Sequence, residues 1–219
     1  MVPNFRNEAR GALERARAEL TSGDSRRIRY AALELRIAIE ALTFDRAQSY
    51  KKEIPPEQYE TWQPRKLLSM LLEIDPNADK TSSLRFGEEE KYGEPAKVMH
   101  SLGTDSVLGL ATIKEHYDAL GSYLHMPTLK QFSNQKSPNF DSLRERCNTI
   151  VNELTKVLSS PIWNVNFGNF AEFECQRCQN TIRKRIPHSS EKLIAKCVNC
   201  GADYTLTKET NDTTVWEPN

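Results

Sequence analysis

Two cysteine pairs near the C-terminal end constrain this chain more than any other feature of its sequence. Two residues separate Cys175 from Cys178, eighteen residues follow, and Cys197 and Cys200 then repeat the same spacing. Two intervening residues let both thiolates of a pair point to one centre from a tight turn. The four thiolates predict one structural zinc ion, because a complete tetrahedral shell leaves no open position for water. An iron ion with the same four ligands is the alternative.

The residues around the two pairs predict short β-strands. The segments FAEFE, TIRKRI, LIAK and ADYTLTK look like short strands, and Gly201 supplies the permissive backbone that a turn after the last cysteine needs. Residues 165–219 are therefore interpreted as a zinc ribbon. Its apolar content is too small for folding without the metal, which takes the place of a core.

The rest of the chain shows helical periodicity. Apolar residues recur at helical spacing over five segments, which are residues 5–20, 28–50, 64–74, 106–124 and 140–158. Asp105 or Ser106 is expected to cap the fourth helix. Runs at residues 82–86 and 96–101 flank the charged loop GEEEKYGEP, as in a β-hairpin. The predicted fold is mainly α, with a helical bundle and a small β-hairpin insertion over residues 1–160, followed by the zinc-ribbon β domain.

The second helical segment carries apolar residues on two opposite faces. Tyr30, Leu33, Ile37 and Phe44 form the second face, so this helix is expected to pack on both sides or to serve self-association in a homodimer. Cys147 falls within an apolar stripe of the last helix, and we expect it to pack in the core.

Charge and hydropathy exclude several classes of protein. Thirty basic residues balance thirty acidic ones in 219 residues, so no global field draws the chain to nucleic acid or to an anionic membrane. The charged N-terminal segment lacks the apolar core of a signal peptide, and no stretch reaches the roughly 18 apolar residues of a membrane span. These features predict a cytoplasmic protein without a membrane partner.

One local patch departs from this balance. Six basic residues lie between the first and last cysteine, against one acidic residue: Arg177, Arg183, Lys184, Arg185, Lys192 and Lys196. They are candidates for contacts with the phosphates of RNA or DNA. The alternative interpretation is a solvated strand face, because no aromatic residues interleave the patch as base-stacking platforms would.

The helical part is similar to a HEPN-type domain, on the long helix LELRIAIEAL with Arg36 and Glu40 and on the later helix ending HYDALGSYLH at His125. The resemblance implies a prokaryotic protein of a defence or toxin–antitoxin system. In active ribonucleases of this family, four to six residues separate an arginine from the histidine that follows it. Here Asp118, Ala119 and Leu120 occupy those positions, so the family's catalytic motif is absent.

Three hypotheses follow for the function. The first is a noncatalytic zinc-ribbon protein with a HEPN-like helical body that binds nucleic acid or a partner protein. The second is a metal-independent ribonuclease that uses His125 with Arg36 and Glu40. In that case the histidine would act as acid or base, whereas an intrahelical ion pair and a helix cap explain the same residues structurally. The third is a homodimeric adaptor that docks proteins through the ribbon.

Overall fold

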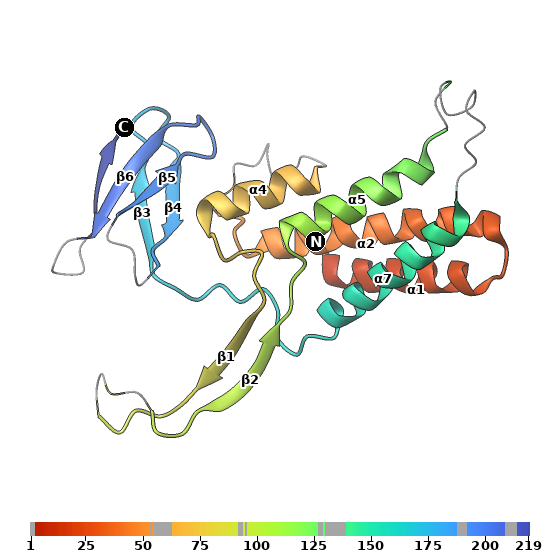
Figure 1. Ribbon diagram of the computed structural model, residues 1–219. Coiled ribbons are helices and arrows are strands. Elements are labelled where there is room, and N and C mark those ends of the chain that lie inside the picture. The colour runs from red at the N-terminus through yellow and green to blue at the C-terminus, as the bar shows by residue number, and fades with distance from the viewer. Residues whose placement is uncertain are drawn as a thin grey trace. The chain divides into compact units, whose positions relative to one another are not determined.

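The computed structural model describes residues 3–52, 54, 63–91, 94, 96–126, 129, 139–187, 192–208 and 214–219, and it confirms the predicted fold class (Figure 1). The helices are α1 (Phe5–Thr21), α2 (Ile28–Gln48), α4 (Pro64–Ile74), α5 (Leu110–Leu124) and α7 (Phe140–Leu158), with a 3-10 turn η1 (Ser25–Arg27) before α2. The strands are β1 (Ser82–Phe86), β2 (His100–Asp105), β3 (Phe170–Glu174), β4 (Thr181–Arg185), β5 (Lys192–Lys196), β6 (Asp203–Lys208) and β7 (Thr214–Pro218). None of the described helices is long and apolar enough to cross a membrane.

The chain divides into two compact units. The first comprises residues 1–45 and 80–164, and the second comprises residues 46–79 and 165–219. Each unit has its own set of buried apolar side chains, so each is described separately below.

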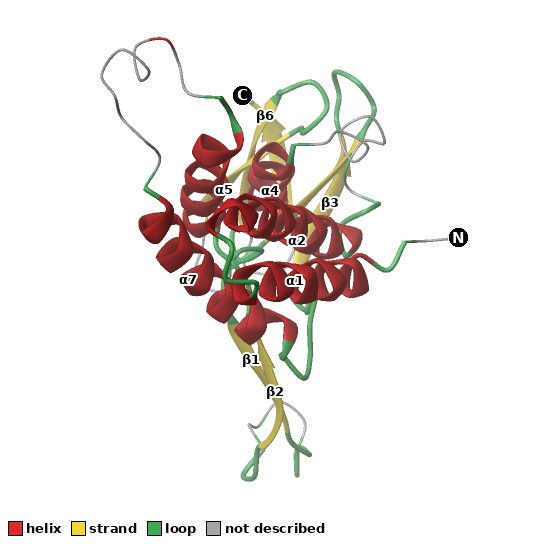
Figure 2. Cartoon of the chain, turned by 90° about the vertical axis from the view of Figure 1, so that its right-hand side faces the viewer, coloured by secondary structure: helices red, strands yellow, loops and turns green. Residues whose placement is uncertain are grey.

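Apolar stripes at helical spacing build the core of the first unit. Small residues of α1 are fully buried, as are the larger side chains of α2, α5 and α7. The buried residues include Ala9, Ala12, Ala16, Leu35, Ile39, Leu120, Leu143, Ile150 and Leu154. Cys147 has no exposed surface, as expected for a core position, and burial raises the pKa of its thiol to about 12. Figure 2 shows these helices bundled together.

Local signals define the helix ends in most cases. Asn4 and Asn139 accept hydrogen bonds from backbone amides of the first turns of α1 and α7. Gly23 takes a φ of 74° after α1, a left-handed conformation that glycine adopts without strain, and Asp24 then caps η1. The expected cap of α5 is wrong, because Asp105 ends strand β2 and the helix begins only after Gly109.

Helix α2 is not packed on both sides along its whole length. Its inner face is buried, but Tyr30, Leu33 and Ile37 are 60%, 45% and 37% exposed. Phe44, on the same face, stacks against Phe5 with the ring centroids 5.3 Å apart. The prediction of two packed faces is therefore wrong for the first half of the helix, because no described segment of the first unit covers that half.

The hairpin β1–β2 extends from one end of the helices of the first unit (Figure 2). Strand β1 has the predicted bounds, whereas β2 lies four residues beyond its predicted start. The two strands pair antiparallel, and the register shifts between Leu84 and Arg85. At the base of the hairpin, a Cβ on Gly103 would lie 2.5 Å from Pro161, so glycine is required for this close approach.

The second unit combines α4 with two small antiparallel sheets. Pro64 occupies the first turn of α4, where its missing amide hydrogen costs nothing, and Leu67, Leu68 and Leu71 form the buried face of the helix. One sheet pairs β3 with β4, and the other has the order β5-β6-β7. Strand β7 was not predicted. Side chains of both sheets share one core, to which Phe173, Tyr204 and Leu206 contribute together with Cys175 and Cys197.

Candidate metal centre

The first cysteine pair lies on a turn that follows β3. The amide of Cys175 donates to the carbonyl of Asn180 over 2.9 Å, and the amide of Gln179 donates to the carbonyl of Cys175 over 2.8 Å. Gln179 has a φ of 58°, in the left-handed region that residues other than glycine rarely adopt. This turn directs the thiols of Cys175 and Cys178 to the same side.

The second pair repeats this arrangement after β5. The amide of Cys197 donates to the carbonyl of Ala202 over 2.8 Å, and the amide of Gly201 donates to the carbonyl of Cys197 over 2.8 Å. Gly201 has a φ of 75°, which confirms the reason for a glycine at this position. Gln179 occupies the position in the first turn that Gly201 occupies in the second. An alignment of the two cysteine pairs would have shown this equivalence from the sequence.

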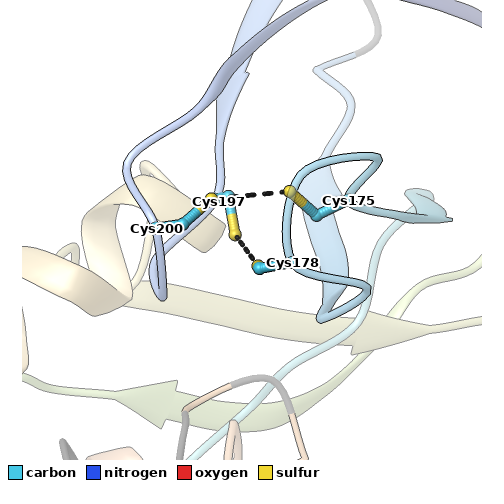
Figure 3. A group of neighbouring side chains, drawn as sticks. All are labelled: Cys175, Cys178, Cys197 and Cys200. Carbon is cyan, nitrogen blue, oxygen red and sulfur yellow. Dashed lines mark hydrogen bonds between the residues drawn. The ribbon is translucent and has the colours of Figure 1, made fainter.

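The two turns bring the four sulfur atoms together (Figure 3). Sγ of Cys175 lies 3.6 Å from Sγ of Cys200, and Sγ of Cys178 lies 3.6 Å from Sγ of Cys197. All four sulfur atoms lie within 4.8 Å of one another. A tetrahedral ion with metal–sulfur bonds of about 2.3 Å requires sulfur–sulfur distances of about 3.8 Å. The four cysteines therefore form a cluster that could hold one metal ion, as the sequence predicts.

Hydrogen bonds and burial give Cys175 and Cys197 different pKa values in the metal-free protein. Burial of Cys175 acts to raise its pKa, but hydrogen bonds from Tyr204 and from the backbone amides of Cys178 and Arg177 outweigh burial and lower the pKa to about 6. Burial dominates at Cys197 and raises its pKa to about 12. The metal-free cluster is thus expected to hold a mixture of thiols and thiolates near neutral pH.

Tyr204 supports the cluster from the second coordination shell. Its hydroxyl donates to Sγ of Cys175 over 3.2 Å and accepts from the amide of Gln176 over 2.8 Å. Its ring lies edge-on to Phe173 at 5.2 Å, and Phe173 stacks on Trp216 at 4.7 Å. Alternation along β6 places the Tyr204 side chain on the face of the strand that points into the core, but no sequence signal indicated its hydrogen bond to a cysteine.

Two of the six predicted nucleic-acid-binding residues make contacts within the second unit. Arg185 forms an ion pair of 2.7 Å with the buried carboxylate of Asp75, which also accepts a hydrogen bond of 2.8 Å from Tyr50. Lys184 donates to the backbone carbonyl of Glu73, and burial lowers the pKa of Lys184. These contacts attach β4 to the last turn of α4, and nothing in the sequence pointed to Asp75.

The other four basic residues are distributed over both sheets. Arg183 lies over the ring of Phe170 at 4.2 Å from the centroid, and Arg177, Lys192 and Lys196 are exposed. Acidic residues accompany them: Arg183 pairs across the strands with Glu172, and Lys196 pairs with Asp203.

The predicted catalytic residues lie in the first unit, and only two of them form a cluster. The hydroxyl of Tyr117 donates to the carboxylate of Glu40 over 2.6 Å, and the guanidinium of Arg36 lies 3.9 Å from the centroid of the Tyr117 ring. Burial, followed by this hydrogen bond to Glu40, raises the pKa of Tyr117. His125 is exposed just after α5, and among the described residues no hydrogen bond or ion pair joins it to Arg36 or Glu40.

Comparisons with protein-family models, with curated proteins and with solved structures find no significant match to this chain. The similarity to a HEPN-type domain therefore rests on its sequence features alone and stays a prediction. The four-cysteine cluster is the strongest indication of function that the molecule carries.

Proposed function

We propose that Cys175, Cys178, Cys197 and Cys200 hold one structural zinc ion that maintains the fold of the ribbon. The observation that carries the proposal is the approach of all four sulfur atoms to within 4.8 Å of one another from two turns with matching hydrogen bonds. Four thiolates complete a tetrahedral shell and leave no position for a substrate or a catalytic water. Zinc is preferred over iron because a ribbon with this small a core requires a tightly bound ion without redox chemistry.

The proposed role of the whole chain is that of a noncatalytic module whose ribbon binds a partner protein. The outer face of the β5-β6-β7 sheet supports this role, because Ile194, in the middle of the edge strand β5, is 61% exposed. Lys192 and Lys196 flank Ile194 on the same face of β5. A partner protein with an apolar contact residue and an acidic rim would fit this arrangement.

Charge distribution favours a protein over nucleic acid as the partner. Arg185 forms an ion pair with Asp75, Lys184 donates to the backbone carbonyl of Glu73, and acidic residues pair across the strands with Arg183 and Lys196. A phosphate-binding groove instead collects uncompensated positive charge. The resemblance adds a prokaryotic and cytoplasmic setting in defence or toxin–antitoxin biology to the proposal.

Binding assays distinguish the two kinds of partner. Tagged full-length protein is used to isolate partners from native cells, and Ile194→Asp is expected to lose a partner that Tyr30→Asp, a change at an exposed residue of α2, retains. Fluorescence anisotropy with labelled RNA and DNA at two salt concentrations forms the second arm. Binding that falls with salt and with neutralisation of Arg177, Lys192 and Lys196 together would replace the protein proposal with the nucleic-acid one.

The metal-independent ribonuclease is a second candidate function. Tyr117 and Gly121 lie four residues apart on α5, and a Cβ at Gly121 would lie 3.0 Å from the guanidinium of Arg36. Arg36 therefore lies beside the second half of α5, and His125 directly follows the last residue of this helix. This candidate predicts RNA cleavage that His125→Ala abolishes and that the change of another exposed histidine, His100→Ala, leaves intact. Absence of cleavage by the unmodified protein would eliminate it.

A further inference from the structure

The four-cysteine cluster contains oxidisable sulfur atoms as well as the ligands for a metal. Zinc itself has no redox chemistry, whereas the thiolates that bind it can give electrons to a peroxide. All four sulfur atoms lie within 4.8 Å of one another, and the two sulfur atoms of a disulfide are about 2.05 Å apart. Small movements of the two turns would therefore be enough to join the sulfur atoms in pairs.

Each of the two turns has one accessible cysteine. Cys178 and Cys200 are half-buried, whereas Cys175 and Cys197 are each only 1% exposed. Oxidation of a cysteine requires access to its sulfur atom as well as thiolate character. A peroxide in solution is therefore expected to reach Cys178 and Cys200 before the other two.

Each half-buried cysteine lies beside the buried cysteine of the opposite turn (Figure 3). Sγ of Cys178 is 3.6 Å from Sγ of Cys197, and Sγ of Cys200 is 3.6 Å from Sγ of Cys175. A thiolate held this close can attack an oxidised sulfur atom without the help of a second molecule. The buried cysteine of one turn is thus placed to react with the oxidised cysteine of the other.

We infer, on the basis of the zinc ion proposed above, that the cluster is a peroxide-sensitive switch that releases zinc and forms two disulfides between the turns. The inferred pairs are Cys178–Cys197 and Cys175–Cys200. The alternative pairing, Cys175–Cys178 and Cys197–Cys200, would close each turn on itself. Only the inferred pairing keeps the turn after β3 attached to the turn after β5 once the metal has left.

The oxidation of each pair consumes one molecule of hydrogen peroxide. The thiolate of Cys178 attacks one peroxide oxygen, the O–O bond breaks, and a sulfenic acid and a hydroxide ion form. The thiolate of Cys197 then attacks the oxidised sulfur and displaces a second hydroxide ion, which leaves the disulfide. Cys200 and Cys175 react in the same way. In total, four thiolates lose four electrons, two peroxide molecules are reduced, and four hydroxide ions take up protons from the buffer to give water.

Loss of the thiolates removes the ligands of the metal. A disulfide sulfur lacks the negative charge with which a thiolate binds zinc, so the ion is expected to pass into solution. A dithiol reductant should reverse the change, because bridges between the turns keep all four sulfur atoms within reach of one ion. Cys147 is expected to take no part, since it has no exposed surface.

Titration of the full-length, zinc-loaded protein with hydrogen peroxide is the first part of the test. The protein is purified with a reductant, the reductant is removed, and the zinc content is measured before any peroxide is added. A coloured chelator then reports the release of zinc, against a sample without peroxide. We expect loss of the one zinc ion per chain, complete after two equivalents of peroxide, and its return after reduction with a dithiol in the presence of zinc.

Mass spectrometry of tryptic peptides then determines the pairing. Trypsin cleaves after Arg177 and after Lys196, so Cys175 and Cys178 fall on different peptides, whereas residues 197–208 form one peptide with two cysteines. The inferred bridges join three peptides into one species, and fragmentation between Cys197 and Cys200 assigns each bridge. Alkylation of the oxidised protein should label only Cys147, and Cys147→Ala is the control that should show the same zinc release and the same bridges.

Several results would overturn the inference. Residues 197–208 that are linked to no other peptide would show bridges within the turns, and the pairs Cys175–Cys197 and Cys178–Cys200 would equally contradict the inferred pairing. Zinc that stays bound in a large excess of peroxide, or sulfinic acids without disulfides, would show that the cluster is not a switch. Zinc that does not return after reduction would exclude a reversible one. Reduced protein without zinc before the titration would instead contradict the proposed function itself.

Discussion

The helical unit and the ribbon reach a stable fold by different means. Of the twelve largest fully buried side chains in the described part of the chain, strands β3–β7 contribute only Tyr204 and Leu206. Burial of two such side chains contributes about 3–6 kcal/mol. A structural zinc ion contributes about 10–16 kcal/mol. With the proposed zinc ion bound, the ribbon would depend on four ligands at one point, whereas the helices depend on distributed apolar burial.

This difference predicts where each region is sensitive to change. Loss of a methyl group from the helical core leaves many other apolar contacts in place. Loss of one thiolate would instead remove the proposed metal site that joins the two sheets of the ribbon. Asp75 is a second point of this kind, because its buried carboxylate accepts from both Arg185 and Tyr50.

The largest effect is expected from Cys197→Ser. Loss of one thiolate should release the metal and unfold β3–β7, whereas α1, α5 and α7 keep their structure. Hydrogen exchange followed by mass spectrometry would show fast exchange only in the ribbon. Cys147→Ala is the control in the other region, and it should retain the metal and lower the free energy of unfolding of the helices by about 1 kcal/mol. Metal loss in both variants would contradict the distinction between the two regions.

Asp75→Ala is expected to have the next largest effect. It removes the acceptor of Nη1 of Arg185 and of the hydroxyl of Tyr50 and breaks the buried ion pair, which should lower the free energy of unfolding of the second unit by about 3 kcal/mol. Glu94→Gln removes the exposed pair with Lys91 and should cost less than about 0.5 kcal/mol. Denaturant unfolding compares the two variants, and equal losses would show that Asp75 has no special role.

Metal affinity is expected to fall as the pH decreases. Cys197, with its pKa raised to about 12, must release a proton to bind metal at neutral pH, whereas Cys175 is already a thiolate above pH 6. Below about 6, both thiols compete with protons, so affinity should fall more steeply. Tyr204→Phe removes a hydrogen bond to the Cys175 thiolate and should weaken binding about 10-fold, with the steep region displaced to higher pH.

Competition with a coloured chelator at several pH values measures this dependence. Tyr30→Phe, a change on the exposed face of α2, serves as the control and should follow the wild-type curve. A Tyr204→Phe curve that superimposes on the wild-type curve would exclude the proposed effect of the hydroxyl on Cys175.

The smallest effects concern the two turns of the ribbon. Gln179 and Gly201 both have left-handed backbones, with φ values of 58° and 75°. Gln179→Gly should therefore stabilise the ribbon by about 1 kcal/mol, and Gly201→Ala should destabilise it by a similar amount. Thermal unfolding of the zinc-loaded protein checks both changes. Shifts of the same sign would show that the turns are not equivalent.

Sequence periodicity was sufficient for much of the fold. The bounds of α4 and α7 and of β1, the core position of Cys147 and the convergence of the four cysteines are all confirmed. These features depend on local spacing, which a sequence displays directly.

The wrong or missing predictions share a dependence on tertiary contacts. Pairing of Ser82 with Asp105 extends β2 through the residue that was expected to cap α5. Strand β7 exists because β6 offers it an edge, although its own residues do not alternate. The exposed face at Leu33 has a strong apolar period, and periodicity alone does not show whether a partner segment covers it. The Asp75 network joins residues far apart in the sequence, so no motif marks it.

Metal content of the purified full-length protein tests the central claim most directly. Mass spectrometry of the elements, combined with a protein concentration from amino-acid analysis, should find one zinc ion per chain. Stepwise chelation should then expose the ribbon to hydrogen exchange while the helices of the first unit stay protected. Protein that contains no zinc and yet keeps a protected ribbon, or that holds iron in its place, would contradict the account.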